Sequence, residues 1–309
     1  MARRKVSVIG AGKVGSTTAH LLVLKKLADV VLVNRTVGLA QGVALDIKQS
    51  MPIEGSDSDI IGTDDYSQIE GSDVVVITAG AQRKEGMTRD DLLKTNAQIV
   101  SEIALRIKQY APDSIVVVVS NPLDAMAYLV RQKTGFKKSR IIGMAGALDS
   151  ARLTSFIAER LRVAPREIRT MILGSHGDSM VPILSATTVN EFPVEKLIEK
   201  EKLMAIVERA RNGGAEIIKL EGSSAYYAPA SSVVSMVDSI LNDKKAVVAC
   251  SAYLEGEYGL SGLFIGVPAV LGKDGIERIE EIALSEEERK LLADSATKIS
   301  AQLPLLEGI

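Results

Sequence analysis

The first half of this 309-residue sequence predicts an α/β fold with a doubly wound parallel sheet, and the second half predicts a mixed α+β domain. Three observations support the parallel sheet. Short β-branched runs alternate with segments of helical periodicity, these runs are apolar throughout, and a glycine-rich segment follows the first of them. Strands that helices cover on both faces have this apolar pattern, and the alternation is typical of a doubly wound fold. We place the domain boundary so that the domains span 1–145 and 146–309.

The buried strands of the first half are expected at residues 6–9, 30–33, 74–77, 115–119 and 140–142. The clearest helix follows Thr88 and ends before Pro112, because its apolar residues recur on one face. These residues are Leu92, Ile99, Ile103, Ile107 and Tyr110.

The second half contains longer helical segments, which we expect at residues 194–220 and 230–241. Residues 246–253 and 263–267 are expected to pair as antiparallel strands. The last helix is expected to begin at Ser285, because Glu288 three residues later completes a capping box. No linker rich in proline, glycine or serine separates the halves, so we expect them to pack rigidly.

Composition excludes several classes of protein. The 46% apolar and 25% charged residues are typical of a globular protein. The net charge of −2 gives no basic stripe for nucleic acid. Apolar runs stay far below the roughly 18 residues that span a bilayer, so we expect no membrane partner. The one cysteine, Cys250, can form no intrachain disulfide and no paired-cysteine metal site, which favours a reducing cytoplasm.

Residues 10–15 read Gly-Ala-Gly-Lys-Val-Gly and match the G-x-G-x-x-G pattern of a Rossmann dinucleotide site, because they join a strand to a helix. Gly10 allows the tight turn, Gly12 lets the backbone approach a pyrophosphate, and Gly15 lets the helix pack on the strand. The start of the helix then offers free N–H groups to phosphate. An ordinary strand-to-helix turn is the alternative.

The second strand ends at Asn34, Arg35 and Thr36, where an NAD site normally has an acidic residue for the ribose diol. An aspartate there would repel a 2′-phosphate, whereas Asn34 would not and Arg35 could pair with it. We therefore hypothesise that the site accepts NADP as well as NAD, and that it prefers NADP where Arg35 pairs with the phosphate. The alternative is that Arg35 is only solvated and Asn34 holds the diol of NAD.

His176 is the candidate base, since it lies between two glycines after a short apolar run. The other histidine, His20, falls inside the first helix, where a packing or surface role is expected. Asp149 and Arg152 lie three residues apart and would share one face of a helix. They form either a local ion pair or a unit in which Asp149 orients an imidazole and Arg152 binds a carboxylate.

A polar loop at residues 79–89 contains Arg83 and Arg89 and has glycines near both ends, so it could close as a lid. A charged loop is usually only solvated, which is the alternative. Asn121 follows the strand at 115–119, although an Asn-Pro pair also marks a plain turn. Ligands of open α/β sheets bind at the carboxyl ends of strands. Gly10, Asn34, Gly80 and Asn121 all occupy such positions.

Together these motifs resemble the lactate/malate dehydrogenase family, and more closely its lactate-dehydrogenase-like malate dehydrogenases. The resemblance covers nearly the whole chain. It includes residues 10–12, 148–152, 174–178, 225–229 and 256–259. It implies reversible NAD(P)-dependent oxidation of (S)-malate to oxaloacetate by a cytoplasmic homodimer or homotetramer.

By this resemblance, His176 accepts the proton of the substrate hydroxyl, and Asp149 fixes the tautomer of its ring. Arg152 binds the C1 carboxylate, Arg89 stabilises the developing oxyanion, and Asn121 hydrogen-bonds the reacting oxygen. The resemblance assigns no residue to a metal. It assigns to the cofactor Gly10, Gly12, Gly15, Asn34, Arg35, Asn96 and Asn121.

Arg83 occupies the position where lactate-specific members of the family have glutamine and malate-specific members have arginine. A second carboxylate needs a second cation, so we expect a small dicarboxylate as substrate. Residues 223–225, Ser-Ser-Ala, replace the threonine of the lactate pattern and leave room for a larger substrate.

Three other functions are alternatives. The first is lactate dehydrogenase or a related 2-hydroxy acid dehydrogenase, and the second is a non-catalytic NAD(P)-binding regulator. The third is a metal-dependent glycosidase on a related fold, but one cysteine and two histidines supply too few ligands for it.

Overall fold

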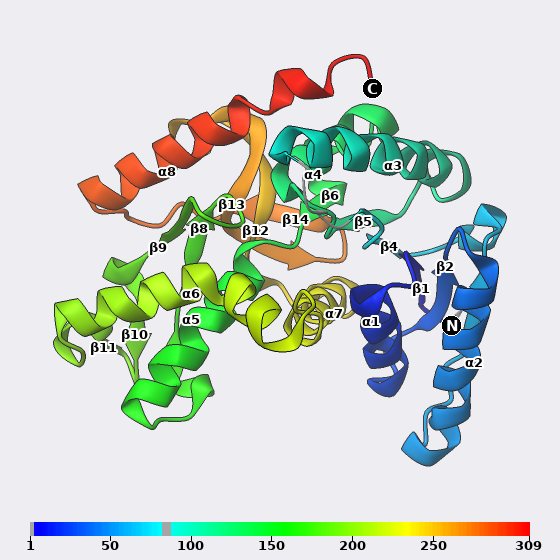
Figure 1. The fold of residues 1–309 in the computed structure, drawn as a ribbon, viewed down its shortest axis with the longest axis horizontal. Coiled ribbons are helices and arrows are strands. Elements are labelled where there is room, and N and C mark those ends of the chain that lie inside the picture. Colours follow the sequence, from blue (N-terminus) through cyan, green and yellow to red (C-terminus); the bar gives the residue numbers. More distant parts are fainter. Residues whose placement is uncertain (1–2, 82–87) are drawn as a thin grey trace.

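A computed structural model describes residues 3–81 and 88–309 of the chain (Figure 1). Its main sheet has the strand order β3-β2-β1-β4-β5-β6-β12-β13-β8-β9, and β14 pairs with β13. A smaller sheet joins β11, β10 and β7. No helix in these two ranges is long and apolar enough to cross a membrane.

The strands of the first half are parallel, as predicted. They are β1 (Lys5–Ile9), β2 (Asp29–Val33), β3 (Ile60–Thr63), β4 (Val74–Ile77), β5 (Ile115–Val118) and β6 (Ile141–Gly143). The helices between them are α1 (Lys13–Leu24), α2 (Val37–Glu54), α3 (Arg89–Tyr110) and α4 (Leu123–Thr134).

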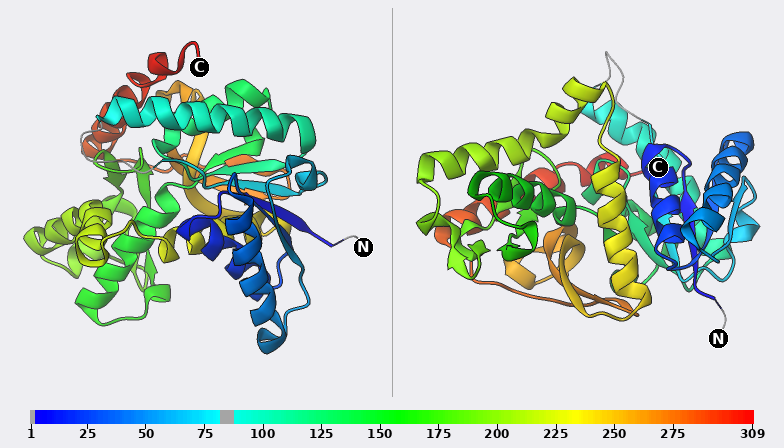
Figure 2. Two further views of the ribbon diagram at one scale, coloured as in Figure 1. Left: turned by 45° about the vertical axis from the view of Figure 1, so that its right-hand side comes forward. Right: turned by 90° about the horizontal axis from the view of Figure 1, so that it is seen from below.

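Alternate residues of these strands enter two hydrophobic cores, one on each face of the sheet. Val6 and Val8 of β1 pack in the core that contains α1 and α2. Ile9, Val75 and Val116 pack in the core that contains α3 and α4. Figure 2 shows α3 on one side of the sheet and the blue helices α1 and α2 on the other. The doubly wound parallel sheet is therefore confirmed.

The second half continues the same sheet. Its first two long strands, β12 and β13, pair antiparallel, and Ser251 of β12 stands opposite Gly143 of β6. The strands are β7 (Ile168–Arg169), β8 (Ile172–Gly174), β9 (Met180–Pro182), β10 (Thr188–Val189), β11 (Phe192–Pro193), β12 (Ala246–Glu255), β13 (Ser261–Gly272) and β14 (Gly275–Ile279). The helices are α5 (Gly146–Leu161), α6 (Lys200–Glu221), α7 (Tyr227–Leu241) and α8 (Glu286–Ser300).

Helices α3 and α8 each begin with a capping box. The hydroxyl of Ser285 accepts the N–H of Glu288, whose carboxylate accepts the N–H of Ser285, as predicted. Thr88 and Asp91 make the same reciprocal pair at the start of α3. The predicted beginnings of these two helices are therefore confirmed.

Several element boundaries differ from the prediction. The segment expected to start a helix at Val194 forms a short 3-10 turn, and α6 begins only at Lys200. In contrast, α7 begins at Tyr227, because Pro229 lies in its first turn, where a missing N–H costs nothing. The strand expected at 140–142 is shifted by one residue to 141–143.

Two elements of the first half were not predicted. The edge strand β3 has only Ile60 fully buried, so it lacks the apolar run of an internal strand. Helix α2 contains two glycines and a proline, and two of its four buried residues are alanines, so its apolar stripe is weak. Both elements depend on tertiary packing more than on local pattern.

Candidate active site

The three glycines of residues 10–15 differ in whether packing requires a glycine at that position. A Cβ on Gly15 would lie 1.8 Å from the carbonyl oxygen of Gly10, and Gly10 itself has a φ of +113°. Packing therefore requires glycine at both positions. A Cβ on Gly12 would meet nothing within 4 Å, so packing does not require this glycine.

The open space beside Gly12 lies at the start of α1. Gly12 is the N-cap of this helix and provides no capping side chain, so the first N–H groups are available to an anion. This cradle fits the pyrophosphate of a dinucleotide. The ammonium of Lys13 donates to the hydroxyl of Ser223 at 2.7 Å and so ties residues 223–225 to the loop.

The two residues expected to read the ribose differ in their surroundings. The Oδ1 of Asn34 accepts the N–H of Ala11 at 3.2 Å, and its amide nitrogen donates to the carbonyl of Thr36. Asn34 thus holds the phosphate loop. Arg35 is exposed, and no described residue forms a hydrogen bond or ion pair with its guanidinium. A cation is therefore available beside the predicted ribose position.

Asn96 and Asn121 meet at the carboxyl edge of β4 and β5. Asn96 is buried in α3, and its amide nitrogen donates to the carbonyl of Asn121 at 2.7 Å. Its Oδ1 accepts the N–H of Ala81 at 2.6 Å. The Asn96 side chain thus bonds the backbone on both sides of the edge, while the Asn121 side chain remains exposed.

His176, Asp149 and Arg152 form one hydrogen-bonded unit. The Nδ1–H of His176 donates to Oδ2 of Asp149 at 2.9 Å, and an Nη1–H of Arg152 donates to Oδ1 at 3.2 Å. The Asp149 side chain is only 3% exposed, against 19% for His176 and 15% for Arg152. Because Nδ1 carries the proton, Nε2 of His176 is left as the acceptor. The structure thus shows the local ion pair together with the orientation of the imidazole by Asp149, whereas carboxylate binding by Arg152 stays a prediction.

Opposing effects act on the imidazole of His176. Burial lowers the pKa of His176, but the charge of Asp149 and the hydrogen bond to it outweigh burial, so the pKa lies above its ordinary value. The charge of Arg152 lowers this pKa and that of Asp124 raises it. The ring is therefore prepared to hold a proton.

Arg152 lies against two glycines of α6 that were not predicted as part of a site. A Cβ on Gly213 would lie 3.3 Å from Cδ of Arg152, and one on Gly214 would lie 3.6 Å from a terminal nitrogen. Glycine inside a helix costs about 1 kcal/mol relative to alanine. Gly213 therefore leaves room for the Arg152 side chain, whereas a Cβ on Gly214 would make only an ordinary contact, and a glycine pair within a helical pattern was the available signal.

Asp124 was also not predicted. It lies in the first turn of α4, three residues after Asn121, and only 5% of it is exposed. Its Oδ1 accepts the hydroxyl of Ser251 at 2.6 Å. Burial raises the pKa of Asp124 to about 6 against the opposing effects of Ser251 and His176. A single acidic residue in a helical segment gives no spacing signal.

Other predicted residues have different outcomes. Arg83 lies outside the described residues, and of Arg89 the structure gives only its place at the start of α3. His20 lies half-buried in α1. No group of three or more potential metal ligands occurs within residues 3–81 and 88–309.

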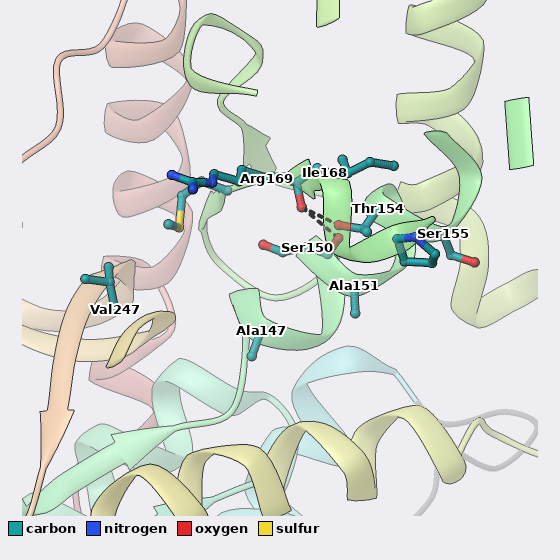
Figure 3. A pocket seen from close by; sticks show the side chains of 11 residues that line it. Ala147, Ser150, Ala151, Thr154, Ser155, Ile168, Arg169 and Val247 are labelled. Atoms are coloured by element: carbon teal, nitrogen blue, oxygen red, sulfur yellow. Dashed lines mark hydrogen bonds between the residues drawn. The ribbon is translucent and has the colours of Figure 1, made fainter. Parts of the chain in front are cut away.

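A pocket of about 730 Å³ lies beside α5 (Figure 3). It lies on the face of that helix opposite the face that carries Asp149 and Arg152. Ser150 and Thr154 line it, whereas the helical period turns Asp149 and Arg152 away from them. The hydroxyl of Thr170 joins this wall by donating to the carbonyl of Ser150. The cavity is therefore separate from the His176 unit.

Comparisons with known proteins identify the family of the chain. The family profile of the lactate/malate dehydrogenase NAD-binding domain matches residues 4–143, and that of the lactate/malate dehydrogenase α/β C-terminal domain matches residues 146–306. A malate dehydrogenase of Roseiflexus sp. (strain RS-1) is 49% identical over 308 residues, which cover 99% of this chain and 100% of the relative.

Solved structures are similar along almost the whole chain as well. The malate dehydrogenase of Picrophilus torridus in its apo form has a TM-score of 0.96 and 42% identity, covering 99% of this chain and 98% of its own. A lactate dehydrogenase of Cryptosporidium parvum, complexed with lactic acid and nicotinamide adenine dinucleotide, has a TM-score of 0.96 and 39% identity. It covers 100% of this chain and 99% of its own.

The two glycine environments predict different effects of alanine. Gly15→Ala should destabilise the fold by about 1–3 kcal/mol, because its Cβ would overlap the Gly10 carbonyl. Gly12→Ala should melt near the wild-type temperature but bind NADH more weakly. Thermal denaturation and NADH fluorescence titration measure the two effects, and equal melting of both variants would contradict this assignment.

Proposed function

Because this chain belongs to the lactate/malate dehydrogenase family, we propose that it is a malate dehydrogenase that catalyses the reversible NAD(P)-dependent oxidation of (S)-malate to oxaloacetate. Near 48% identity over almost the whole chain to relatives of that name supports the proposal. The observation that carries it is the hydrogen-bonded unit of His176, Asp149 and Arg152.

Proton transfer falls to His176. A nicotinamide cofactor held at this site would supply the hydride chemistry at C2 of the substrate, which leaves only the proton to the side chains of the protein. Nε2 of His176 accepts the hydroxyl proton, since Nδ1 already donates to Asp149. The buried carboxylate of Asp149 then stabilises the imidazolium. In the reduction of oxaloacetate the protonated ring returns this proton.

The substrate is oriented by arginine side chains and by the side-chain amide of Asn121. Arg152 uses one N–H on Asp149, and its remaining donors can bind the C1 carboxylate. Asn121 is exposed at the carboxyl edge of β5 and donates to the reacting oxygen. Arg89, at the start of α3, stabilises the developing oxyanion, and Arg83 binds the second carboxylate. The roles of these last two residues rest on the family resemblance.

The cofactor site is the edge formed by β1, β2, β4 and β5. Residues 1–145 bind the dinucleotide, with the pyrophosphate over Gly12, and residues 146–309 supply His176 and Arg152. We propose that NADP is accepted and preferred over NAD. The absence of an acid at position 34 and the guanidinium of Arg35, which pairs with none of the described residues, support this proposal. Asn96 contributes by holding Ala81 and Asn121 in place.

We also propose that the enzyme is a cytoplasmic homodimer or homotetramer. Helix α2 exposes Leu39, Leu45 and Ile53, the last to 86%, which gives a second copy an apolar surface to cover. The single buried thiol of Cys250 supports a reducing compartment.

Replacing the base should abolish turnover without loss of cofactor. We expect His176→Asn to lower kcat by about 10²-fold or more, because a general base contributes roughly that much, while NADH affinity stays unchanged. His20→Asn is the matched control and should keep its activity. Absorbance assays with oxaloacetate measure both, and full activity of His176→Asn would refute the mechanism.

Substrate selectivity should depend on Arg83. Arg83→Gln should lower the ratio of kcat/KM for oxaloacetate to that for pyruvate by about 10- to 100-fold, the value of one charge-assisted contact. The exposed Arg166→Gln controls for loss of a positive charge. Steady-state kinetics with both keto acids give the ratio, and an unchanged ratio would refute the assignment of substrate selectivity to Arg83.

Cofactor preference should depend on Arg35. Arg35→Ala should reduce the preference for NADPH over NADH by about 10- to 100-fold, because the 2′-phosphate loses its cation. The exposed Arg106→Ala should leave the preference unchanged. The same assays with both cofactors test this, and an unaltered preference in Arg35→Ala would mean that Arg35 is only solvated.

A further inference from the structure

Asp124 is a buried acid that the mechanism above does not use. It comes from the first turn of α4, whereas the acid that the mechanism does use, Asp149, comes from α5. Burial of an ionisable group is costly, so the position needs a reason. The Ser251 hydroxyl donates a hydrogen bond to the Asp124 carboxyl at 2.6 Å. The position of Ser251 in the sheet therefore shows which part of the site Asp124 lies beside.

The position of Ser251 in the sheet shows where Asp124 lies relative to the loop that carries His176. Ser251 stands opposite Gly143 on β6 and opposite Gly266 on β13, and Gly266 stands opposite Gly174 on β8. These four small residues form a row across the sheet. His176 follows the last of them by two residues, so the Ser251–Asp124 pair lies at the base of its loop.

Glycine is required along this row. A Cβ on Gly143 would lie 2.7 Å from Cβ of Ser251, and one on Gly266 would lie 2.4 Å from the carbonyl oxygen of Gly174. Larger side chains would push the strands apart or fill the space above them. The row thus keeps α4 and the His176 loop close to one another.

The carboxyl of Asp124 and the ring of His176 interact in both directions. The charge of His176 and the proximity of its backbone N–H lower the pKa of Asp124, against the larger effect of burial. In return, the charge of Asp124 raises the pKa of His176. The other charges that act on the ring are Asp149 and Arg152, both from α5, so Asp124 is the contribution from α4.

We propose that Asp124 is a positioning residue for His176. Its buried carboxylate, held by Ser251, anchors the backbone of the His176 loop and provides a second negative charge for the imidazolium. The catalytic consequence rests on the proposed function, whereas the contact with His176 does not. Asp149 therefore orients the ring through Nδ1, and Asp124 acts from the side of α4.

The contact can be tested without any substrate. The chain has two histidines, so a His20→Gln background leaves one imidazole whose Cε1 proton can be titrated by NMR. Asp124→Asn keeps the shape and removes the charge, so the titration midpoint of His176 should fall. Ser251→Ala should lower it less, because it makes the Asp124 carboxyl harder to ionise. Ser239→Ala, another buried serine, should leave it unchanged.

Activity then separates positioning from a general structural role. Oxaloacetate reduction needs protonated His176, so kcat/KM should decline above its pKa, and in Asp124→Asn this decline should move to lower pH. An equal loss at every pH, or an unmoved NMR midpoint in the soluble variant, would overturn the proposal. If Asp124→Asn does not fold, an unmoved midpoint in Ser251→Ala overturns it instead. A shifted midpoint in a protein inactive toward oxaloacetate would support the contact and refute the proposed function.

Discussion

The buried carboxylate of Asp149 is the constraint on which the site depends. A charge removed from water has to be satisfied on both oxygens, and here one oxygen takes an imidazole and the other a guanidinium. The Asp149 carboxylate therefore sets the tautomer of His176 and the direction of Arg152 at the same time. Helix α5 has to lie against the loop after β8 for this geometry to form, and the long sheet brings them together.

The parallel and antiparallel halves of the sheet position different parts of the site. Its parallel half aligns strand ends, so that the phosphate loop, Asn34 and Asn121 share one edge. Its antiparallel half brings β8 beside β13 and thereby places His176 near the residues that follow β6. Tight packing at a few glycines makes both arrangements possible. The positions of the site residues are thus set mainly by the pairing of the strands that carry their loops.

Much of this could be predicted from the sequence, and the omissions have physical causes. Strands buried on both faces, such as β1, have a pattern that few other structures share. The edge strand β3 lacks that pattern because one side meets solvent. The pairing of His176 with Asp149 could be predicted because their flanking motifs are distinctive. Asp124 acts through neighbours distant in sequence, so no local spacing indicates it, and the one local signal for Gly213 is the glycine pair within a helical pattern.

The junction at Gly143 and Ser251 also bears on how the protein can be divided. The cofactor-binding half buries Phe264 of β13 in one of its own cores, and β6 gives its outer side to β12. A fragment ending at residue 145 would leave that side of β6 without a partner and open an apolar gap above it. Unpaired strands of this kind recruit other chains. Excising the nucleotide-binding half would therefore yield an aggregating fragment, and domain exchange with a relative would have to carry β12 and β13 along.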